Sequence, residues 1–212
     1  KLNFTRLNHI FISHLHGDHC FGLLGLISTF GLLGRTATLH IYAHPELERL
    51  LTPHLEFFCK GMTYDVEFHS IDPSKAEVIY EDRSVTISTI PLKHRIPTCG
   101  FLFLEKKRNQ EPIKRYAYCS DTRYNLGMIE QIQGVQTLFH ESTFSEKLAI
   151  RAAKAGHSTA KQAADIALRS GTQKLIIGHF SARIPDHQEL LVEAQEIFPD
   201  TVLAVERTTI DI

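Results

Sequence analysis

This chain of 212 residues has no long hydrophobic run, no paired cysteines and no excess of charge of one sign. The longest apolar stretch, residues 20–33, is interrupted by three glycines, and a bilayer-spanning helix needs about 20 apolar residues. We therefore expect no membrane anchor. The formal net charge of −1 gives no overall attraction to polyanions, so contact with a nucleic acid would depend on local basic patches.

The four cysteines lie 20 to 40 residues apart and form no C-x-x-C pair, which disfavours a zinc ribbon or a redox motif. We expect buried, reduced thiols and a cytoplasmic protein. Because the chain begins with Lys1 and not with Met, we expect it to be trimmed or partial. An apolar content of 43% at this length is enough for one substantial core, so we expect a single domain over residues 1–212.

Strand and helix patterns are distributed along the whole chain. Runs rich in Val, Ile, Phe and Tyr predict strands at 9–13, 37–43, 66–71, 77–82, 84–92, 99–106, 115–120, 137–140, 174–178 and 201–206. Helical patterns fall at 20–33, 45–59, 124–133, 145–155, 158–170 and 186–197. Thr159 and Gln162 have the spacing of a capping box, and Gly171 can end the helix that follows. Because residues 66–120 are nearly all strand, we expect an α/β fold with sheets sandwiched between helices, not a doubly wound sheet.

The most informative segment directly follows the first predicted strand. It holds three imidazoles and a carboxylate within six positions: His14, His16, Asp18 and His19. Burying so many unpaired polar groups would cost several kcal/mol, so a divalent metal is their natural partner. Later predicted strands also end in metal-compatible side chains, namely His94, Asp121, Glu141 and His179.

Strand ends converge at one edge of a sheet, so these side chains predict a shared site. Five imidazoles and two of the three carboxylates are about the complement for two metal ions some 3.5–4 Å apart, with one carboxylate bridging them. Nitrogen and oxygen ligands without thiolate suit Zn²⁺ first, with Mn²⁺ or Fe²⁺ as alternatives.

The segment 11–22, FISHLHGDHCFG, resembles the signature of the metallo-β-lactamase superfamily. Later segments resemble the motifs of the ribonuclease Z family within it: KHRIPTCGF at 93–101, SDTR at 120–123, LFHESTF at 138–144, GHSTA at 156–160 and GHFSAR at 178–183. The resemblance implies an αββα sandwich, in which two mixed β-sheets are flanked by helices. It also implies a zinc-dependent endoribonuclease that removes the 3′ trailer from precursor tRNA, and a homodimer.

The resemblance further implies a site. It assigns His14, His16 and His94 to one Zn²⁺ and Asp18, His19 and His179 to a second, with Asp121 between the two. A metal-bound hydroxide would attack phosphorus, and Asp18 beside it would orient the hydroxide or accept its proton. His157, with Glu141 as its carboxylate partner, would assist the departing 3′ oxygen. The products would be a tRNA with a 3′-OH and a trailer with a 5′-phosphate.

Several alternatives stay open on sequence alone. The first cluster could be a structural metal site, although such sites prefer closed, thiolate-rich tetrahedra. Glu141 and His157 could support the site without transferring protons. Another phosphodiesterase of the superfamily, arylsulfatase-like or specific for cyclic nucleotides, would share the metals, whereas a non-catalytic RNA-binding subunit should lack the ligands.

The remaining histidines are interpreted as structural. His140 alternates away from Glu141 on its strand, so we expect it to pack in the core. Six others have no partner at ligand spacing and are interpreted as surface or structural residues: His9, His40, His44, His54, His69 and His187. Two segments usual in the family are expected to be missing from this sequence, namely the opening strands before the first motif and the flexible tRNA-gripping arm near 106–114. Either the protein lacks the arm, or the sequence omits it and joins its neighbours.

Overall fold

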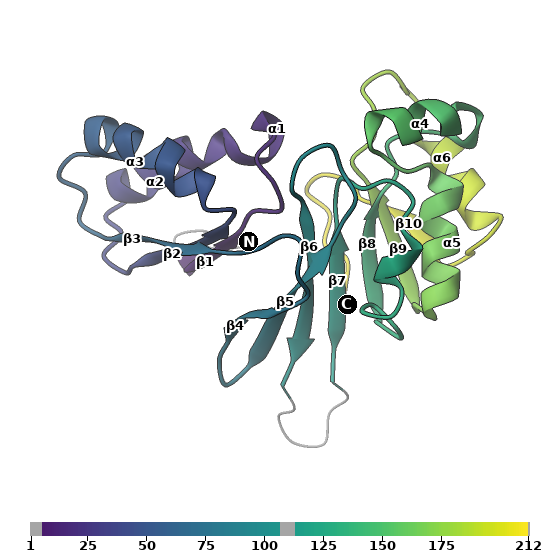
Figure 1. Ribbon diagram of the computed structural model, residues 1–212, viewed down its shortest axis with the longest axis horizontal. Coiled ribbons are helices and arrows are strands. Elements are labelled where there is room, and N and C mark those ends of the chain that lie inside the picture. The colour runs from purple at the N-terminus through teal and green to yellow at the C-terminus, as the bar shows by residue number, and fades with distance from the viewer. Residues whose placement is uncertain (1–5, 107–112, 212) are drawn as a thin grey trace. The chain divides into compact units, whose positions relative to one another are not determined.

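The computed structural model describes residues 6–106 and 113–211 (Figure 1). The chain forms two compact units, Lys1–Asp72 and Pro73–Ile212. The expectation of a single domain stays a prediction. Within the described ranges, no helix has both the length and the apolar character needed to cross a membrane.

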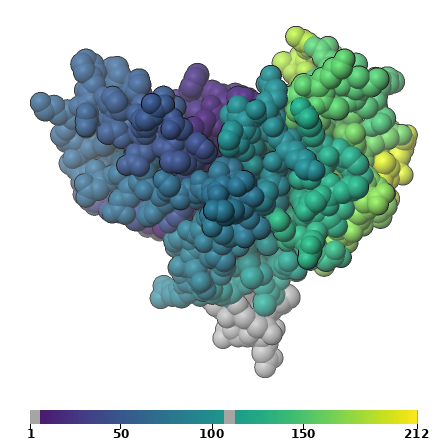
Figure 2. All heavy atoms as spheres, viewed as in Figure 1, coloured from purple at the N-terminus to yellow at the C-terminus, as the bar shows by residue number. Residues whose placement is uncertain are grey.

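The first unit is a three-stranded parallel sheet with its helical crossovers. Strands β1 (His9–Phe11), β2 (Leu39–Ala43) and β3 (Val66–Ser70) lie in the order β1-β2-β3. Helices α1 (Gly17–Cys20) and α2 (Gly22–Leu32) connect β1 to β2, and α3 (Glu46–Phe58) connects β2 to β3, because parallel neighbours need a crossover. Atoms of α3 (blue) form much of the surface of this unit that faces the viewer in Figure 2.

The core of the first unit lies between its helices and one face of the sheet. Alternate strand residues Leu39, Ile41 and Ala43 pack in one cluster with Ile27 and Phe30 of α2. Since successive strand side chains point to opposite faces, the intervening residues of β2, His40 among them, lie on the other face. The sheet of this unit therefore has one apolar face and one face with polar side chains.

The second unit is built on a seven-stranded mixed sheet in the order β10-β9-β8-β7-β6-β5-β4. Its antiparallel part comprises β4 (Val78–Glu81), β5 (Val85–Pro91), β6 (Cys99–Glu105) and β7 (Arg115–Cys119). From β7 onward the neighbours are parallel: β8 (Thr137–Glu141), β9 (Lys174–Gly178) and β10 (Thr201–Leu203). Helices α4 (Ala149–Ala155), α5 (Ala160–Ser170) and α6 (His187–Gln195) lie together beside β8–β10 (Figure 1).

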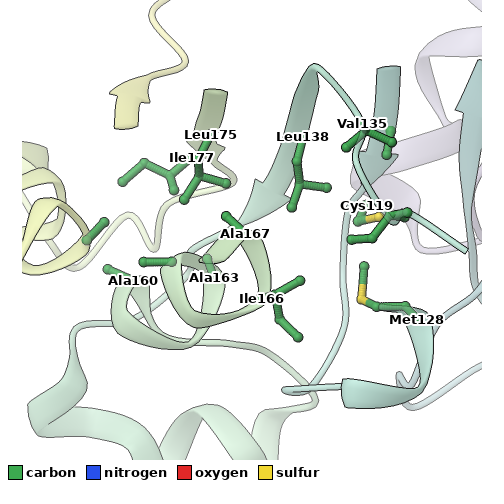
Figure 3. Close-up of a cluster of buried hydrophobic side chains, with 14 of the residues drawn as sticks. Cys119, Met128, Val135, Leu138, Ala160, Ala163, Ile166, Ala167, Leu175 and Ile177 are labelled. Atoms are coloured by element: carbon green, nitrogen blue, oxygen red, sulfur yellow. The ribbon is translucent and has the colours of Figure 1, made fainter. Parts of the chain in front are cut away.

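Helix α5 packs on the parallel strands through alanines. Ala163 and Ala167 are fully buried against a cluster that includes Leu138 and Leu175, and small side chains allow a close approach of helix to sheet (Figure 3). The predicted capping box is present, because the Thr159 hydroxyl accepts from the backbone N–H of Gln162 at 3.2 Å and the Gln162 side chain accepts from that of Thr159 at 3.0 Å.

The helix predicted at 124–133 is wrong. The structure has only a 3₁₀ turn, Leu126–Met128, followed by further turns. Asn125 Oδ1 accepts from the N–H of Gly127 at 3.2 Å, and Gly134 ends the segment at φ +64°. Met128 and Ile132 are fully buried, so the apolar pattern reflects turns anchored in the core and not a helix.

Two smaller expectations have clear outcomes. All four cysteines, Cys20, Cys59, Cys99 and Cys119, are buried thiols that form no disulfide, as expected. The last strand is shorter than predicted, since β10 ends at Leu203 and a turn follows at residues 206–207.

Candidate metal centre

The first unit gathers the amino-terminal donors in the loop after β1. His14 is only 1% exposed, and its Nε2 lies 3.1 Å from Nδ1 of His16. Its Nδ1 lies 3.0 Å from the hydroxyl of Ser13, which fixes the orientation of the ring. Burial and two polar contacts therefore hold the His14 imidazole in one position.

Helix α1 adds the other two donors of this segment. Asp18 Oδ2 lies 3.5 Å from Nε2 of His19, and the rings of His14 and His19 have centroids 4.1 Å apart. Gly17 begins this helix, and a Cβ there would lie 2.5 Å from the exposed ring of Phe21, which would have to move. The loop after β1 and helix α1 thereby place three imidazoles and one carboxylate of the predicted set close together.

In the second unit, Asp121 lies two residues after the end of β7 and has an imidazole near each of its two oxygens. Oδ1 is 3.2 Å from Nε2 of His179, and Oδ2 is 3.6 Å from Nε2 of His94. The carboxylate is almost fully buried, with a side-chain exposure of 3%. A carboxylate with a different imidazole at each oxygen has the arrangement required to bridge two cations.

The hydrogen bond of His94 provides a test of whether these residues suit a metal. Its Nδ1 lies 2.7 Å from the carbonyl oxygen of Gly156, which can only accept, so Nδ1 carries the hydrogen. In the neutral ring, Nε2 is then an acceptor that faces the acceptor Oδ2 of Asp121. A cation between two such acceptors removes their repulsion, so the donor set fits a metal.

Glu141 and His157 form a buried pair beside this group. His157 Nδ1 donates to Glu141 Oε1 at 2.8 Å, and the two side chains are 12% and 0% exposed. Burial acts to lower the pKa of His157, but the adjacent Glu141 carboxylate outweighs it, and the pKa is raised overall. The pair therefore favours a protonated imidazole next to Asp121.

Glu141 is held by further donors. Its carboxylate also accepts from the backbone N–H of Thr122 at 2.9 Å, and from the N–H and hydroxyl of Thr143 at 3.1 and 2.7 Å. With His157, four donors satisfy this fully buried carboxylate. Such a network fixes the position of the oxygen that orients His157.

Thr143 is a residue of the site that the sequence-based prediction missed. Its Oγ1 lies within 2.9 Å of Nδ1 of His179 as well as 2.7 Å from Glu141. It therefore connects the acid–base pair to a predicted metal ligand. The motif ESTF contained it, but nothing in the sequence distinguished its hydroxyl from those of neighbouring residues.

His179 has an uncommon backbone conformation. Its φ is +57°, in the left-handed region that non-glycine residues seldom adopt. The residue follows β9 directly, and its ring stacks on that of His157 with centroids 5.4 Å apart. Left-handed residues of this kind cluster at functional sites, where the surrounding structure enforces them.

Three of the other histidines, His140, His40 and His69, have contacts that bear on their interpretation. His140 is fully buried, as predicted, and its Nδ1 lies 2.7 Å from the Glu141 carbonyl. His40 and His69, interpreted as surface or structural residues, lie together with Glu67 because strand pairing brings them close, a proximity that the spacing in the sequence did not indicate. The reason is that β2 and β3 are neighbours in space although far apart in sequence.

Comparison with known proteins identifies the class. A protein-family model described as beta-lactamase superfamily domain matches residues 1–180. The short form of human tRNase Z has a similar structure, with a TM-score of 0.84 at 25% identity over 100% of this chain and 82% of that one. The fold is therefore the α/β metallo-β-lactamase fold, with sheets and flanking helices. Of the two sheets expected to be mixed, only the seven-stranded one is, because all the described neighbours in the three-stranded sheet are parallel and joined by helical crossovers.

Comparison of sequences narrows the class further. A ribonuclease Z from Phocaeicola vulgatus is 54% identical over the whole chain, which covers 82% of that protein. A ribonuclease Z from Porphyromonas gingivalis is 46% identical, with 100% of this chain and 84% of that protein covered. The chain belongs to the ribonuclease Z family of the beta-lactamase superfamily.

Proposed function

We propose that this protein is a metal-dependent endoribonuclease that cleaves precursor tRNA and removes its 3′ trailer. The observation that carries the proposal is the 54% identity to a ribonuclease Z over the entire chain. The environment of Asp121 supports it, because a buried carboxylate between two imidazoles is suited to metal-dependent hydrolysis.

We further propose that seven side chains hold two divalent cations, with Zn²⁺ as the first candidate. The family resemblance gives His14, His16 and His94 to one cation, Asp18, His19 and His179 to the other, and Asp121 to both. When bound, such a pair of cations stabilises charge on a phosphate and lowers the pKa of water toward neutrality. The all-nitrogen-and-oxygen donor set also permits Mn²⁺ or Fe²⁺.

The proton chemistry falls to side chains of the chain itself. His157 donates a proton from its Nε2 to the departing 3′ oxygen, and Glu141 holds the ring through Nδ1 and favours the protonated form. Asp18 orients the attacking water or accepts its proton. The products are a tRNA that ends in a 3′-OH and a trailer that begins with a 5′-phosphate.

The acid role of His157 can be separated from a supporting role. We expect His157→Asn to lower kcat by about 10²- to 10⁴-fold, the range for loss of a general acid. Metal content should not change. His54→Asn is the matched control, because His54 lies on the exposed side of α3 and hydrogen-bonds a backbone carbonyl in the same helix. Wild-type turnover in His157→Asn would refute the acid role.

The substrate class requires its own assay. Full-length protein is incubated with a precursor tRNA of defined 3′ trailer, and the ends of both products are identified by mass. Cyclic nucleotides and an aryl sulfate are tested in parallel, since other enzymes of the superfamily would prefer them. Failure to cleave the precursor tRNA, with turnover of either small substrate, would contradict the proposal.

The assembly and the accessory segments are also proposals. We propose a cytoplasmic homodimer, and sedimentation of the purified protein tests its dimeric state directly. We propose that the tRNA-gripping arm of the family is missing from this sequence near 106–114, a segment largely outside the described residues, either because the protein lacks the arm or because the sequence omits it. The alignment with the Phocaeicola vulgatus protein spans 255 positions against the 212 residues of this chain, which supports extra segments in the relative.

A further inference from the structure

A second group of metal-compatible side chains lies within the first unit, on the face of the sheet opposite its core. In the parallel register, His40 of β2 pairs with Glu67 of β3, and Tyr42 pairs with His69. His40, Glu67 and His69 therefore project from the same face on adjacent strands. None of the three belongs to the seven donors proposed for hydrolysis.

The donor atoms of this group converge. His40 Nδ1 lies 3.1 Å from His69 Nε2 and 3.2 Å from Glu67 Oε2, and His69 Nε2 lies 4.0 Å from the same oxygen. Ligands at 2.0–2.1 Å from a tetrahedral Zn²⁺ are separated by about 3.3 Å. Two of the three separations already match this value, and the third needs only a small rotation of the glutamate.

One well-aligned hydrogen bond does not account for both short contacts. His40 Nδ1 carries at most one hydrogen, which His69 and Glu67 would have to share in a weaker, bifurcated bond. If His69 donates to His40, then two acceptors face each other at the 3.2 Å contact between His40 and Glu67. A cation bound by all three atoms satisfies every lone pair at once.

The rings are held in place by stacking, and the group is open to solvent. The ring of His9 stacks on His40 with centroids 5.0 Å apart, and Tyr42 stacks on His69 at 4.4 Å. The side chains of His40, Glu67 and His69 are 28%, 56% and 38% exposed. A solvated ion can therefore reach donors that are already oriented, which limits the entropy lost on binding.

We propose that His40, Glu67 and His69 bind one divalent cation of the zinc type, in addition to the cations of the hydrolytic centre. Two imidazoles and one carboxylate favour Zn²⁺, Co²⁺ or Ni²⁺ over Mg²⁺ or Ca²⁺. The ion would cross-link β2 to β3 and leave its remaining position to water. It would stabilise the first unit and take no part in cleavage.

The experiment measures metal stoichiometry of the full-length protein. Metal-free wild type is dialysed against graded concentrations of Zn²⁺, and bound zinc per chain is determined by mass spectrometry. His69→Phe keeps a ring to stack on Tyr42 but removes both nitrogens. His54→Phe makes the same chemical change at an exposed residue of α3. Glu67→Gln, at a partly exposed position, provides a second variant if His69→Phe fails to fold.

We expect wild type and His54→Phe to bind one zinc more per chain than His69→Phe, and Glu67→Gln to bind that ion at least tenfold more weakly. The thermal midpoint should rise with Zn²⁺ less in His69→Phe than in wild type. Equal stoichiometry and equal affinity in all four proteins would overturn the proposal and leave a hydrogen-bonded group only. Cleavage of precursor tRNA should persist in His69→Phe, which keeps this test independent of the hydrolytic centre.

Discussion

The network around Glu141 allows a stability change to be worked out from the structure. Glu141→Gln keeps the size of the side chain but replaces one acceptor oxygen by an NH₂ group. Four donors now reach the carboxylate, two from Thr143 and one each from Thr122 and His157. A glutamine oxygen has two lone pairs, so two of these four donors lose their acceptor.

Each unsatisfied buried donor costs about 1–3 kcal/mol, so the free energy of unfolding should fall by about 2–6 kcal/mol. This is a large share of the roughly 5–15 kcal/mol that stabilises a typical protein, and we expect a clear shift of the transition. The loss of the anion should also lower the pKa of His157, since Glu141 is the largest of the influences that raise it.

The assay is urea denaturation of metal-free protein in chelator, followed by circular dichroism. Glu189→Gln is the matched control, because Glu189 pairs with Lys147 at the surface, where solvent screening leaves such a pair with little effect on stability. If the free energy of unfolding of Glu141→Gln lay within about 0.5 kcal/mol of the wild-type value, the hydrogen bonds of the four donors to this carboxylate would not stabilise the fold as we infer.

Two further predictions concern residues near the site. Thr143→Val removes the hydroxyl beside His179, and we expect the affinity for zinc, measured by equilibrium dialysis, to fall by about 10–100-fold. Thr172→Val is the control, because it removes a buried hydroxyl that is hydrogen-bonded to Ser170, and the affinity should not change. Burial lowers the pKa of His140 in the folded protein. Below pH about 6.5 this histidine therefore binds a proton more readily in the unfolded chain than in the folded one, and the free energy of unfolding falls as the pH is lowered. His140→Phe should reduce that slope by up to about 1.4 kcal/mol per pH unit in denaturation of metal-free protein, and identical slopes would contradict the reasoning.

The sheet structure was largely predictable from local pattern. Each of the ten predicted strand segments overlaps an observed strand, as at 99–106, where β6 spans Cys99–Glu105. A half-buried strand shows alternating apolar and polar residues, and a fully buried strand shows a continuous apolar run; both patterns can be recognised within a short segment of sequence. The segment 124–133 failed because an apolar pattern at helical spacing also arises when successive turns place Met128 and Ile132 in the core.

The candidate site was predictable only where residue types are unusual. The cluster His14–His19 and the ends of β7 and β9 stand out by composition, and the structure places the predicted partners His157 and Glu141 in contact. The contact of His40 with His69 depends on the register of β2 against β3, which no short segment encodes. The position of the Thr143 hydroxyl likewise follows from tertiary packing.

The left-handed backbone conformation of His179 means that selection for folding and selection for activity should favour different residues at this position. Because Gly and Asn adopt this conformation with less strain than most residues, a library randomised here and screened for folding alone should be enriched in Gly and Asn. A screen for cleavage should instead return histidine, since neither of those side chains offers an imidazole to Asp121. The preferences of the main chain and the demands of chemistry thus favour different amino acids at the end of β9.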